Sequence, residues 1–489
     1  MIGSEKILQN TIKRCRERNI LIPTYAQMAH PEDIPAGIKD ELREVGLWDT
    51  HPRNLFRITW SNEPTAAGGG FGKKANTLEI PPELSGVPAR IIVLLGAYFP
   101  TGSHKVGATF GPLVERLVRG AFDPTRQKAL WPSTGNYCRG GAFNANLLAC
   151  PSVAVLPEGM SRERFTWLEK MGSEIHATPG SESNVKEVYD KSFALKRERP
   201  DEIVVLNQFE EFGNSIWHYV CTGRAMQEVF LQEQEEGQRL AGLFLTQGSA
   251  GTLAAGDYLK EHFPRMKVCA GEAWPCPTLL LTGYGEHRIE GIGDKHVPWI
   301  HNLKNTDLVA GIDDESCMRL IRLFNETKGK EFLMSRGIPE DCVRSLALLG
   351  ISGIANLIGA IKTARYFEWN GREIILTVAT DSMELYGSRL RELRQERGTY
   401  TEMQAGRDYD ACLMALTTDH VLELGYWDRK RMHNLKYFTW IEQLGKDVTE
   451  LDRQWYDEDY WTEKYMSHVL WDERITAFNL HTGLLDRYR

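Results

Sequence analysis

The sequence predicts an α/β protein in which parallel sheets are covered by helices. From about residue 90, short apolar runs rich in β-branched residues alternate with stretches of helical periodicity, such as 104–120 and 251–263. Apolar runs of this kind are typical of strands buried on both faces, as in parallel sheets between helix layers. The runs predicted as strands are 90–98, 128–134, 152–158, 173–179, 202–208, 241–248, 266–273 and 373–380.

Two flanking regions fall outside this alternation. The chain of 489 residues is long enough for two or three packed units. Residues 1–50 are polar and helical in pattern, and residues 391–489 are helical and rich in aromatic residues, which leaves 51–390 for the α/β core. We interpret the C-terminal region as a packed extension or a dimer contact; a direct role in capping the substrate is the alternative.

Composition excludes several classes of function. The net charge is −8 with acidic and basic residues interspersed, which argues against a nucleic acid or a membrane surface as partner. Nine cysteines without a CxxC pair suggest neither a metal site nor a disulfide framework, and they fit a reducing cytoplasm. The N-terminal segment lacks the apolar stretch of a signal peptide, and no run approaches the roughly 20 apolar residues of a membrane span.

A lysine directly behind a buried strand is the first sign of chemistry. Lys105 lies in "FPTGSHKVGA" (99–108), immediately after the apolar run 90–98. Burying an ammonium group is costly unless its charge is paired or removed. A lysine that forms a Schiff base avoids this cost because it gives up its charge to chemistry.

Three further loops follow predicted strands and carry small or polar residues. "TQGSAGTLAAG" (246–256) can direct backbone N–H groups at a phosphate. "WPSTGNYCRGGAF" (131–143) suits a carboxylate, and "TVATDSMELY" (377–386) offers a serine to a ring nitrogen. Taken singly, each also fits an ordinary turn or a capped helix. The glycine-rich stretch 67–75 follows no strand and is predicted to be a flexible loop.

Together the loops fit one ligand, a phosphorylated aldehyde with an aromatic nitrogen. Lys105 would hold the aldehyde, 248–252 the phosphate, Asn136 the ring hydroxyl and Ser382 the ring nitrogen. Pyridoxal 5′-phosphate has all four features. The sequence therefore predicts this cofactor.

The same motifs resemble those of the fold-type II pyridoxal-phosphate enzymes, the cysteine synthase/cystathionine β-synthase group. The resemblance covers roughly 50–390 and keeps the family's order of motifs: "YFPTGSHK", "STGN", "PEGMSRERFTWLEKMGSEI", "NQFEEFGNSIWHYVCTG", "GSAGT", "RIEGIGDKHVP" and "ATDSMELY". It implies a tryptophan synthase β-like fold of two three-layer αβα subdomains. The catalytic core would be 51–390, with a smaller subdomain of about 110–205 inserted in the larger one.

The resemblance also implies a set of site residues. Lys105 is expected to be the catalytic Schiff-base lysine. The residues expected to bind the cofactor are His104, Lys105, Asn136, Gly248, Ser249, Ala250, Gly251, Thr252, Gly291 and Ser382. Those expected to bind the substrate are Ser133, Thr134, Gly135, Tyr137 and Gln208. No metal ligand is expected.

The sequence departs from the family pattern in four places. His104 is similar to the histidine that helps hold the phosphate in tryptophan synthase β, although the glutamate-bearing loop of that enzyme is absent. Tyr137 stands where a small threonine is usual, and two extra residues follow. Arg139 could pair with a second acidic group on the substrate, but we expect it to lie on the surface. Residues 328–349 form an insertion relative to a minimal cysteine synthase.

The sequence thus predicts a lyase or transferase that acts on a small L-amino acid by β-replacement or β-elimination, through an aminoacrylate. A serine/threonine dehydratase-type ammonia-lyase is the alternative, and a catalytically silent cofactor-binding relative is a third possibility. We further expect a cytoplasmic homodimer that binds neither nucleic acid nor membrane.

Overall fold

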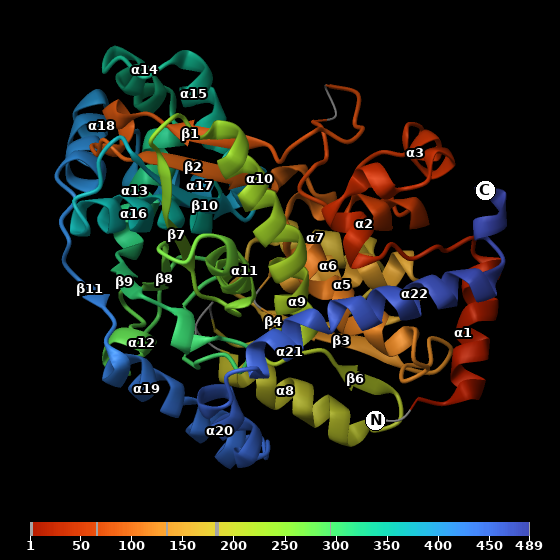
Figure 1. Ribbon diagram of the computed structural model, residues 1–489. Coiled ribbons are helices and arrows are strands. Elements are labelled where there is room, and N and C mark those ends of the chain that lie inside the picture. The colour runs from red at the N-terminus through yellow and green to blue at the C-terminus, as the bar shows by residue number, and fades with distance from the viewer. Residues whose placement is uncertain (1–2, 65–66, 134, 181–184, 294, 489) are drawn as a thin grey trace.

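A computed structural model describes residues 3–64, 67–133, 135–180, 185–293 and 295–488 (Figure 1). It contains two β-sheets, one of seven strands and one of four, with helices packed around both. The mixed α/β architecture with parallel sheets confirms the predicted fold class.

The larger sheet has the strand order β1-β2-β10-β7-β8-β9-β11. Its strands are β1 (Thr77–Ile80), β2 (Arg90–Leu95), β7 (Arg239–Thr246), β8 (Lys267–Ala273), β9 (Leu308–Ile312), β10 (Glu373–Ala379) and β11 (Val421–Glu423). The five inner strands are parallel, and β1 and β11 pair antiparallel at the two edges. The register aligns Ile375 of β10 with Ile91 of β2.

The smaller sheet is parallel throughout and has the order β5-β4-β3-β6. Its strands are β3 (Lys128–Pro132), β4 (Ser152–Pro157), β5 (Glu174–Thr178) and β6 (Ile203–Val205). All four lie in the chain between β2 and β7 of the larger sheet. The edge strand β5 is largely half-buried. The expectation that the run 173–179 is covered on both faces is therefore wrong, since side chains at the edge of a sheet have packing partners from fewer sides.

Helices cover both sheets and form the two flanking regions. In the core they are α4 (Pro82–Ser85), α5 (Lys105–Leu117), α6 (Asn136–Leu147), α7 (Arg162–Lys170), α8 (Val185–Glu198), α9 (Phe212–Trp217), α10 (Gly223–Glu233), α11 (Ala254–His262), α12 (Thr278–Leu281), α13 (Asp314–Asn325), α14 (Thr327–Ser335), α15 (Glu340–Ser345), α16 (Ile351–Tyr366) and α17 (Gly387–Arg397). The predicted insertion 328–349 thus folds as α14 and α15. No single helix in the described ranges is long and apolar enough to cross a membrane. The segments 340–348 and 351–366, which contain α15 and α16, meet the length and composition requirement only when taken together, and the chain bends by 120° between them.

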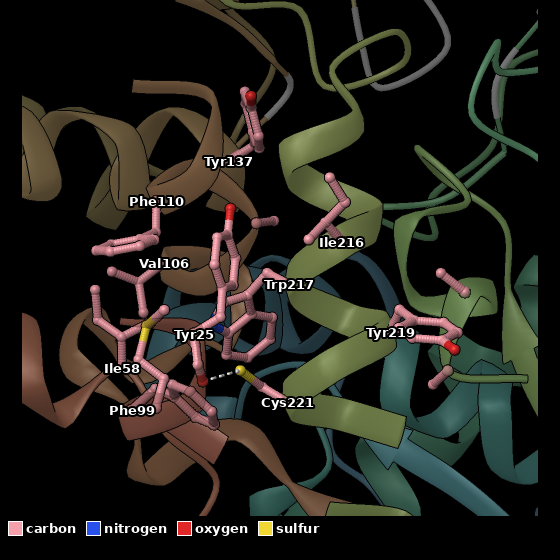
Figure 2. Packing of buried hydrophobic residues seen from close by; sticks show 14 of the residues in the cluster. Tyr25, Ile58, Phe99, Val106, Phe110, Tyr137, Ile216, Trp217, Tyr219 and Cys221 are labelled. Carbon is pink, nitrogen blue, oxygen red and sulfur yellow. Dashed lines mark hydrogen bonds between the residues drawn. The ribbon is translucent and has the colours of Figure 1, made fainter. Parts of the chain in front are cut away.

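A glycine decides how closely α5 and α9 pack. Gly107 is the second residue after Lys105, and a Cβ atom there would lie 2.2 Å from Cε2 of the Trp217 indole. Trp217 is fully buried in the same cluster as Val106 and Phe110 (Figure 2). Any larger residue at this position would push the indole away from α5.

The two terminal regions pack against each other and against the core. The N-terminal helices are α1 (Glu5–Glu17), α2 (Tyr25–Ala29) and α3 (Ala36–Leu42), and the C-terminal ones are α18 (Glu402–Tyr409), α19 (Tyr426–Asn434), α20 (Val448–Tyr456), α21 (Tyr460–Met466) and α22 (His468–Thr482). Helix α22 lies against α1 (Figure 1). The buried Lys436 Nζ donates to the carbonyl oxygens of Trp299 (3.0 Å) and His301 (2.7 Å). The aromatic region is therefore a packed extension of its own chain.

The glycine-rich stretch has more order than a flexible loop. Asn62 and Phe71 form an antiparallel bridge, and the Gly72 N–H donates to the Ser61 carbonyl oxygen (2.6 Å). Gly68 and Gly69 have positive φ angles of 112° and 67°, which suit glycine at a reversal of the chain. The described part of this stretch is therefore held by a bridge to Ser61 and Asn62.

Candidate active site

The predicted site loops follow neighbouring strands, so they converge. In the larger sheet, β2, β10 and β7 are adjacent and parallel, and they are followed by the loops that carry Lys105, Ser382 and Gly248. In the smaller sheet, the adjacent strands β3 and β6 lead to Asn136 and Gln208. The carboxyl ends of parallel strands meet at one edge of a sheet, where α/β proteins bind ligands.

Lys105 is the first residue of α5, ten positions after the end of β2. Two short 3₁₀ turns fill the gap, and Thr101 within them has a φ of 68°. The Lys105 Nζ donates to the Ser249 Oγ at 3.2 Å, which joins the loop after β2 to the loop after β7. Burial lowers the pKa of Lys105 from 10.5 to about 8. A sizeable share of this amine is therefore neutral near pH 8, as a nucleophilic lysine requires.

His104 lies beside the lysine and is fully buried. Its Nε2 is 3.3 Å from the Thr380 Oγ1, just after β10. Burial, followed by the charge of Lys105, lowers the pKa of His104 to about 3, so the imidazole is neutral at physiological pH. It can offer one N–H donor without adding a second charge to the site.

The loop 248–252 connects β7 to α11. Ala250 has a φ of 62°, in the left-handed region, and Gly251 begins the short turn before α11. A Cβ atom at Gly248 would lie 2.6 Å from the Gly291 carbonyl oxygen, so this loop and the predicted ring-lining segment touch. Ser249 and Thr252 are buried. The residues predicted to bind the phosphate thus lie in the same loop as Ser249, which contacts Lys105.

Asn136 and Ser382 follow strands of different sheets, and Asp381 connects them. The Asn136 Nδ2 donates to the Asp381 Oδ2 at 2.5 Å, and the Tyr386 hydroxyl donates to the same oxygen at 2.7 Å. The Ser382 Oγ accepts a bond from the Glu384 N–H at 3.4 Å and caps the turn that follows. The predicted pair therefore lies on two sides of the buried Asp381.

The residues predicted to bind the substrate lie in or just after the loops that follow β3 and β6. The Gln208 Nε2 donates to the Ser133 Oγ at 3.4 Å, and that oxygen also accepts from the Gly135 N–H at 3.2 Å. Tyr137 is buried and packs edge-on against Trp131 with ring centroids 5.6 Å apart. Thr134 lies outside the described residues.

Arg139 does not lie on the surface, so that expectation is wrong. Its side chain is 2% exposed, and its guanidinium packs 5.1 Å from the ring centroid of Trp167 and 5.9 Å from that of Trp48. The Nη2 donates to the Thr101 carbonyl oxygen at 3.2 Å. Burial lowers the pKa of Arg139 to about 10. Arg139 thus braces the turn before Lys105, and its position is set by indoles far away in the sequence.

Three polar residues of this region were missed from the sequence. The Asn214 Nδ2 donates to the Ser249 Oγ and to the Gln208 carbonyl oxygen, both at 3.0 Å. His218 is fully buried, with its ring centroid 5.1 Å from that of His104. Asp381 directly precedes the predicted serine. Asn214 and His218 are four residues apart within the "NQFEEFGNSIWHYVCTG" segment, and this helical spacing was a usable signal.

Several buried polar atoms at this site suit a polar ligand. Within the part of the chain that the structure describes, His104 Nδ1, Asn136 Oδ1 and Asn214 Oδ1 have no hydrogen-bond partner. Such atoms are costly in an apolar interior unless a ligand or water satisfies them. A neutral imidazole, an amide, hydroxyls and a lysine of lowered pKa form a donor set that fits pyridoxal 5′-phosphate.

Comparisons with known proteins agree with this arrangement. The family model described as pyridoxal-phosphate dependent enzyme matches residues 77–331, more than half of the chain. A cysteine synthase of Staphylococcus aureus is 28% identical over 299 residues, 61% of this chain and 87% of that protein. Cystathionine beta-synthase of Saccharomyces cerevisiae is 26% identical over 256 residues, 51% of this chain and 50% of that protein.

Solved structures show the same fold. An O-acetyl serine sulfhydrylase isoform of Entamoeba histolytica superposes with a TM-score of 0.56 at 21% identity, covering 70% of this chain and 94% of its own. An O-acetylserine dependent cystathionine beta-synthase from Helicobacter pylori gives 0.53 at 24% identity, covering 65% and 95%. The predicted tryptophan synthase β-like fold and the predicted cofactor are confirmed. This chain belongs to the pyridoxal-phosphate dependent enzymes, in the fold-type II group of cysteine synthase and cystathionine β-synthase.

Proposed function

We propose that this enzyme catalyses β-replacement or β-elimination on a small L-amino acid, with Lys105 as its catalytic lysine. The observation that carries the assignment is the contact between the Lys105 amine and the loop 248–252, through Ser249 at 3.2 Å. Relatives named cysteine synthase and cystathionine beta-synthase support this reaction class.

The residues around Lys105 divide the work of holding the cofactor. The loop 248–252 and His104 would bind the phosphate, and Asn136 would donate to the ring hydroxyl. Ser382 would face the ring nitrogen and Gly291 would line the ring. When bound, the cofactor supplies a sink for the electrons released when a bond to the substrate α-carbon breaks.

Lys105 is also the best-placed base for the α-proton. With a pKa lowered to about 8 by burial, its amine can accept a proton near neutral pH and return it later. The Ser382 hydroxyl is not an acid, so it can donate a hydrogen bond to the ring nitrogen but does not protonate it. The cofactor is then a moderate electron sink, which favours loss of a β-substituent. The substrate carboxylate would meet Ser133, Gly135, Tyr137 and Gln208.

If a second nucleophile then adds, the reaction is a β-replacement; if water reacts instead, it is a β-elimination. Assays with candidate substrates would distinguish the two. The dehydratase alternative is not favoured by the named relatives. The silent-relative alternative is disfavoured because Lys105, Asn136, Gln208 and Ser382 are all present. The homodimer and the cytoplasmic location stay predictions, which light scattering and cell fractionation would test.

Borohydride reduction followed by peptide mapping tests the lysine assignment. We expect the reduced cofactor on the peptide that contains Lys105. Lys105→Ala should lose this label and lower turnover by orders of magnitude, whereas Lys73→Ala, at an exposed lysine, should change neither. A label on any other lysine would contradict the proposal. Visible spectra recorded with single amino acids would then identify the substrate class.

A further inference from the structure

A buried carboxylate joins the loops of the two sheets at the proposed site. Asp381 is the second residue after β10 of the larger sheet and is 0% exposed, while Asn136 begins α6 after β3 of the smaller sheet. The Asp381 Oδ2 accepts hydrogen bonds from Asn136 Nδ2 (2.5 Å) and from the Tyr386 hydroxyl (2.7 Å). None of the predicted roles uses this carboxylate.

The chemistry of this contact determines which way the Asn136 amide points. The nitrogen of the amide, and not its oxygen, faces Asp381, whose Oδ2 accepts from it. The ionised carboxylate can only accept hydrogen bonds and therefore favours this orientation, and burial raises the pKa of Asp381 above its ordinary value. One of the two amide hydrogens is used there, and the second remains for another acceptor. The Asn136 Oδ1 has no hydrogen-bond partner among the described residues.

The surroundings hold the carboxylate in place. The Gly350 N–H donates to the Asp381 carbonyl oxygen at 3.0 Å, and a Cβ atom at Gly350 would lie 1.8 Å from the Asp381 Oδ1. Only a glycine leaves room for the carboxylate at this point. On the other side, the Tyr386 hydroxyl accepts a bond from the Arg164 Nη2 at 3.1 Å, and Arg164 pairs with the buried Glu290.

We propose that Asp381 is a positioning residue, which orients the Asn136 amide so that its second N–H faces the ring hydroxyl of the cofactor. This inference rests on the proposed function, which assigns Asn136 to that hydroxyl. Without the carboxylate, the Asn136 amide is free to turn by half a rotation and to present its oxygen instead. When the ring hydroxyl is ionised to a phenolate, its oxygen can only accept. Two facing oxygen acceptors then repel, so cofactor binding weakens.

A double-mutant cycle on cofactor affinity tests this role. We expect Asp381→Asn to raise the cofactor dissociation constant roughly 10-fold or more, the range of a charge-assisted hydrogen bond. Asn136→Ala should weaken binding to a similar degree. The double variant should bind within about twofold of Asn136→Ala alone, because Asp381 acts through Asn136. A role that is only structural would weaken binding by the same factor in both backgrounds, and that result would overturn the proposal.

Asp408 provides a matched control. It is also buried, and it accepts hydrogen bonds from the Tyr400 hydroxyl (2.9 Å) and the Arg319 Nε (2.7 Å), in a helical part of the chain away from Lys105. Asp408→Asn should lower stability without changing cofactor affinity. An equal loss of affinity in this variant would mean that removing any buried carboxylate disturbs the site.

Two further arms keep the test decisive. If Asp381→Asn fails to fold, Tyr386→Phe removes the second donor to Asp381 together with the acceptor of the Arg164 Nη2. Its smaller loss of affinity should vanish in the Asn136→Ala background. A loss that persists there would overturn the proposal. Borohydride labelling of the unchanged enzyme separates the proposed function from the positioning role of Asp381. An unlabelled Lys105 refutes the proposed function. A labelled Lys105, together with additive effects of the two substitutions in the double-mutant cycle, refutes only the positioning role.

Discussion

Replacing Gly251 by alanine should damage the loop 248–252 more than removing its serine hydroxyl. A Cβ atom at Gly251 would lie 2.2 Å from the Asn214 Oδ1 and 2.8 Å from its Nδ2. The Asn214 amide cannot move away freely, since it is fully buried and its Nδ2 is bound to Ser249 and Gln208. The added methyl group must therefore displace either the amide or the loop.

The size of the effect follows from these contacts. Overpacking costs about 1–3 kcal/mol, and turning Asn214 away would lose two hydrogen bonds of about 1 kcal/mol each. We expect Gly251→Ala to lower the free energy of unfolding by about 3–5 kcal/mol and to weaken cofactor binding by about 10-fold or more. Ser249→Ala adds no atom and removes one acceptor, so it should weaken binding only about fivefold.

Cofactor titration and urea unfolding of the two variants test this ranking. Gly371→Ala is the control, because the nearest atom to a Cβ there is the Pro88 carbonyl oxygen at 3.7 Å, an ordinary contact. It should change neither quantity. If Ser249→Ala weakens binding as much as Gly251→Ala, the loop is a simple turn and the reasoning about backbone approach is refuted.

The other predictions concern two charged groups, Lys105 and Arg139. Because burial lowers the pKa of Lys105 to about 8, cofactor uptake by the cofactor-free chain should level off above about pH 8 in stopped-flow absorbance; a rate still rising at its ordinary value of 10.5 would contradict this. The same shift predicts that the free energy of unfolding of that chain rises between pH 8 and 10.5, where the unfolded chain binds the extra proton. Arg139→Ala should lower Tm through lost contacts with Trp167 and Thr101. It should change the ratio of kcat/KM for acidic and neutral amino acids by less than about twofold, and a tenfold change would restore the idea that Arg139 selects the substrate.

The strands could be predicted where their own residues required burial. All eight runs predicted from continuous apolar residues contain a strand, because such runs leave little choice but the inside of a sheet. The missed strands are β1, β9 and β11, of four, five and three residues. Two of these are edge strands paired antiparallel. The pairing of β11 depends on β9, which is more than 110 positions away, whereas β1 pairs with the nearby β2.

The site was predictable to the extent that its residues lie in loops after strands. Lys105 and Ser249 do meet: they follow β2 and β7, which lie on the two sides of β10 in the parallel part of the sheet. Asn214 and Asp381 were missed because a buried polar residue looks in sequence like any helix or turn residue. Arg139 was misplaced for the converse reason: a charged helix residue is normally exposed, and only the indoles of Trp48 and Trp167 make its burial possible.

The sequence by itself determined the alternation of strands and helices, the order of the loops and the type of group at each, and hence the cofactor. Those features are local, since strand and helix periodicity extends over only a few residues. Tertiary structure alone decided which polar groups are hydrogen-bonded to each other and which are buried away from solvent. Asn136 and Asp381 are 245 positions apart, and their hydrogen bond exists only because segments that follow strands of the two sheets meet. The lowered pKa of Lys105 has the same origin, because burial is a property of all the segments that pack around the amine.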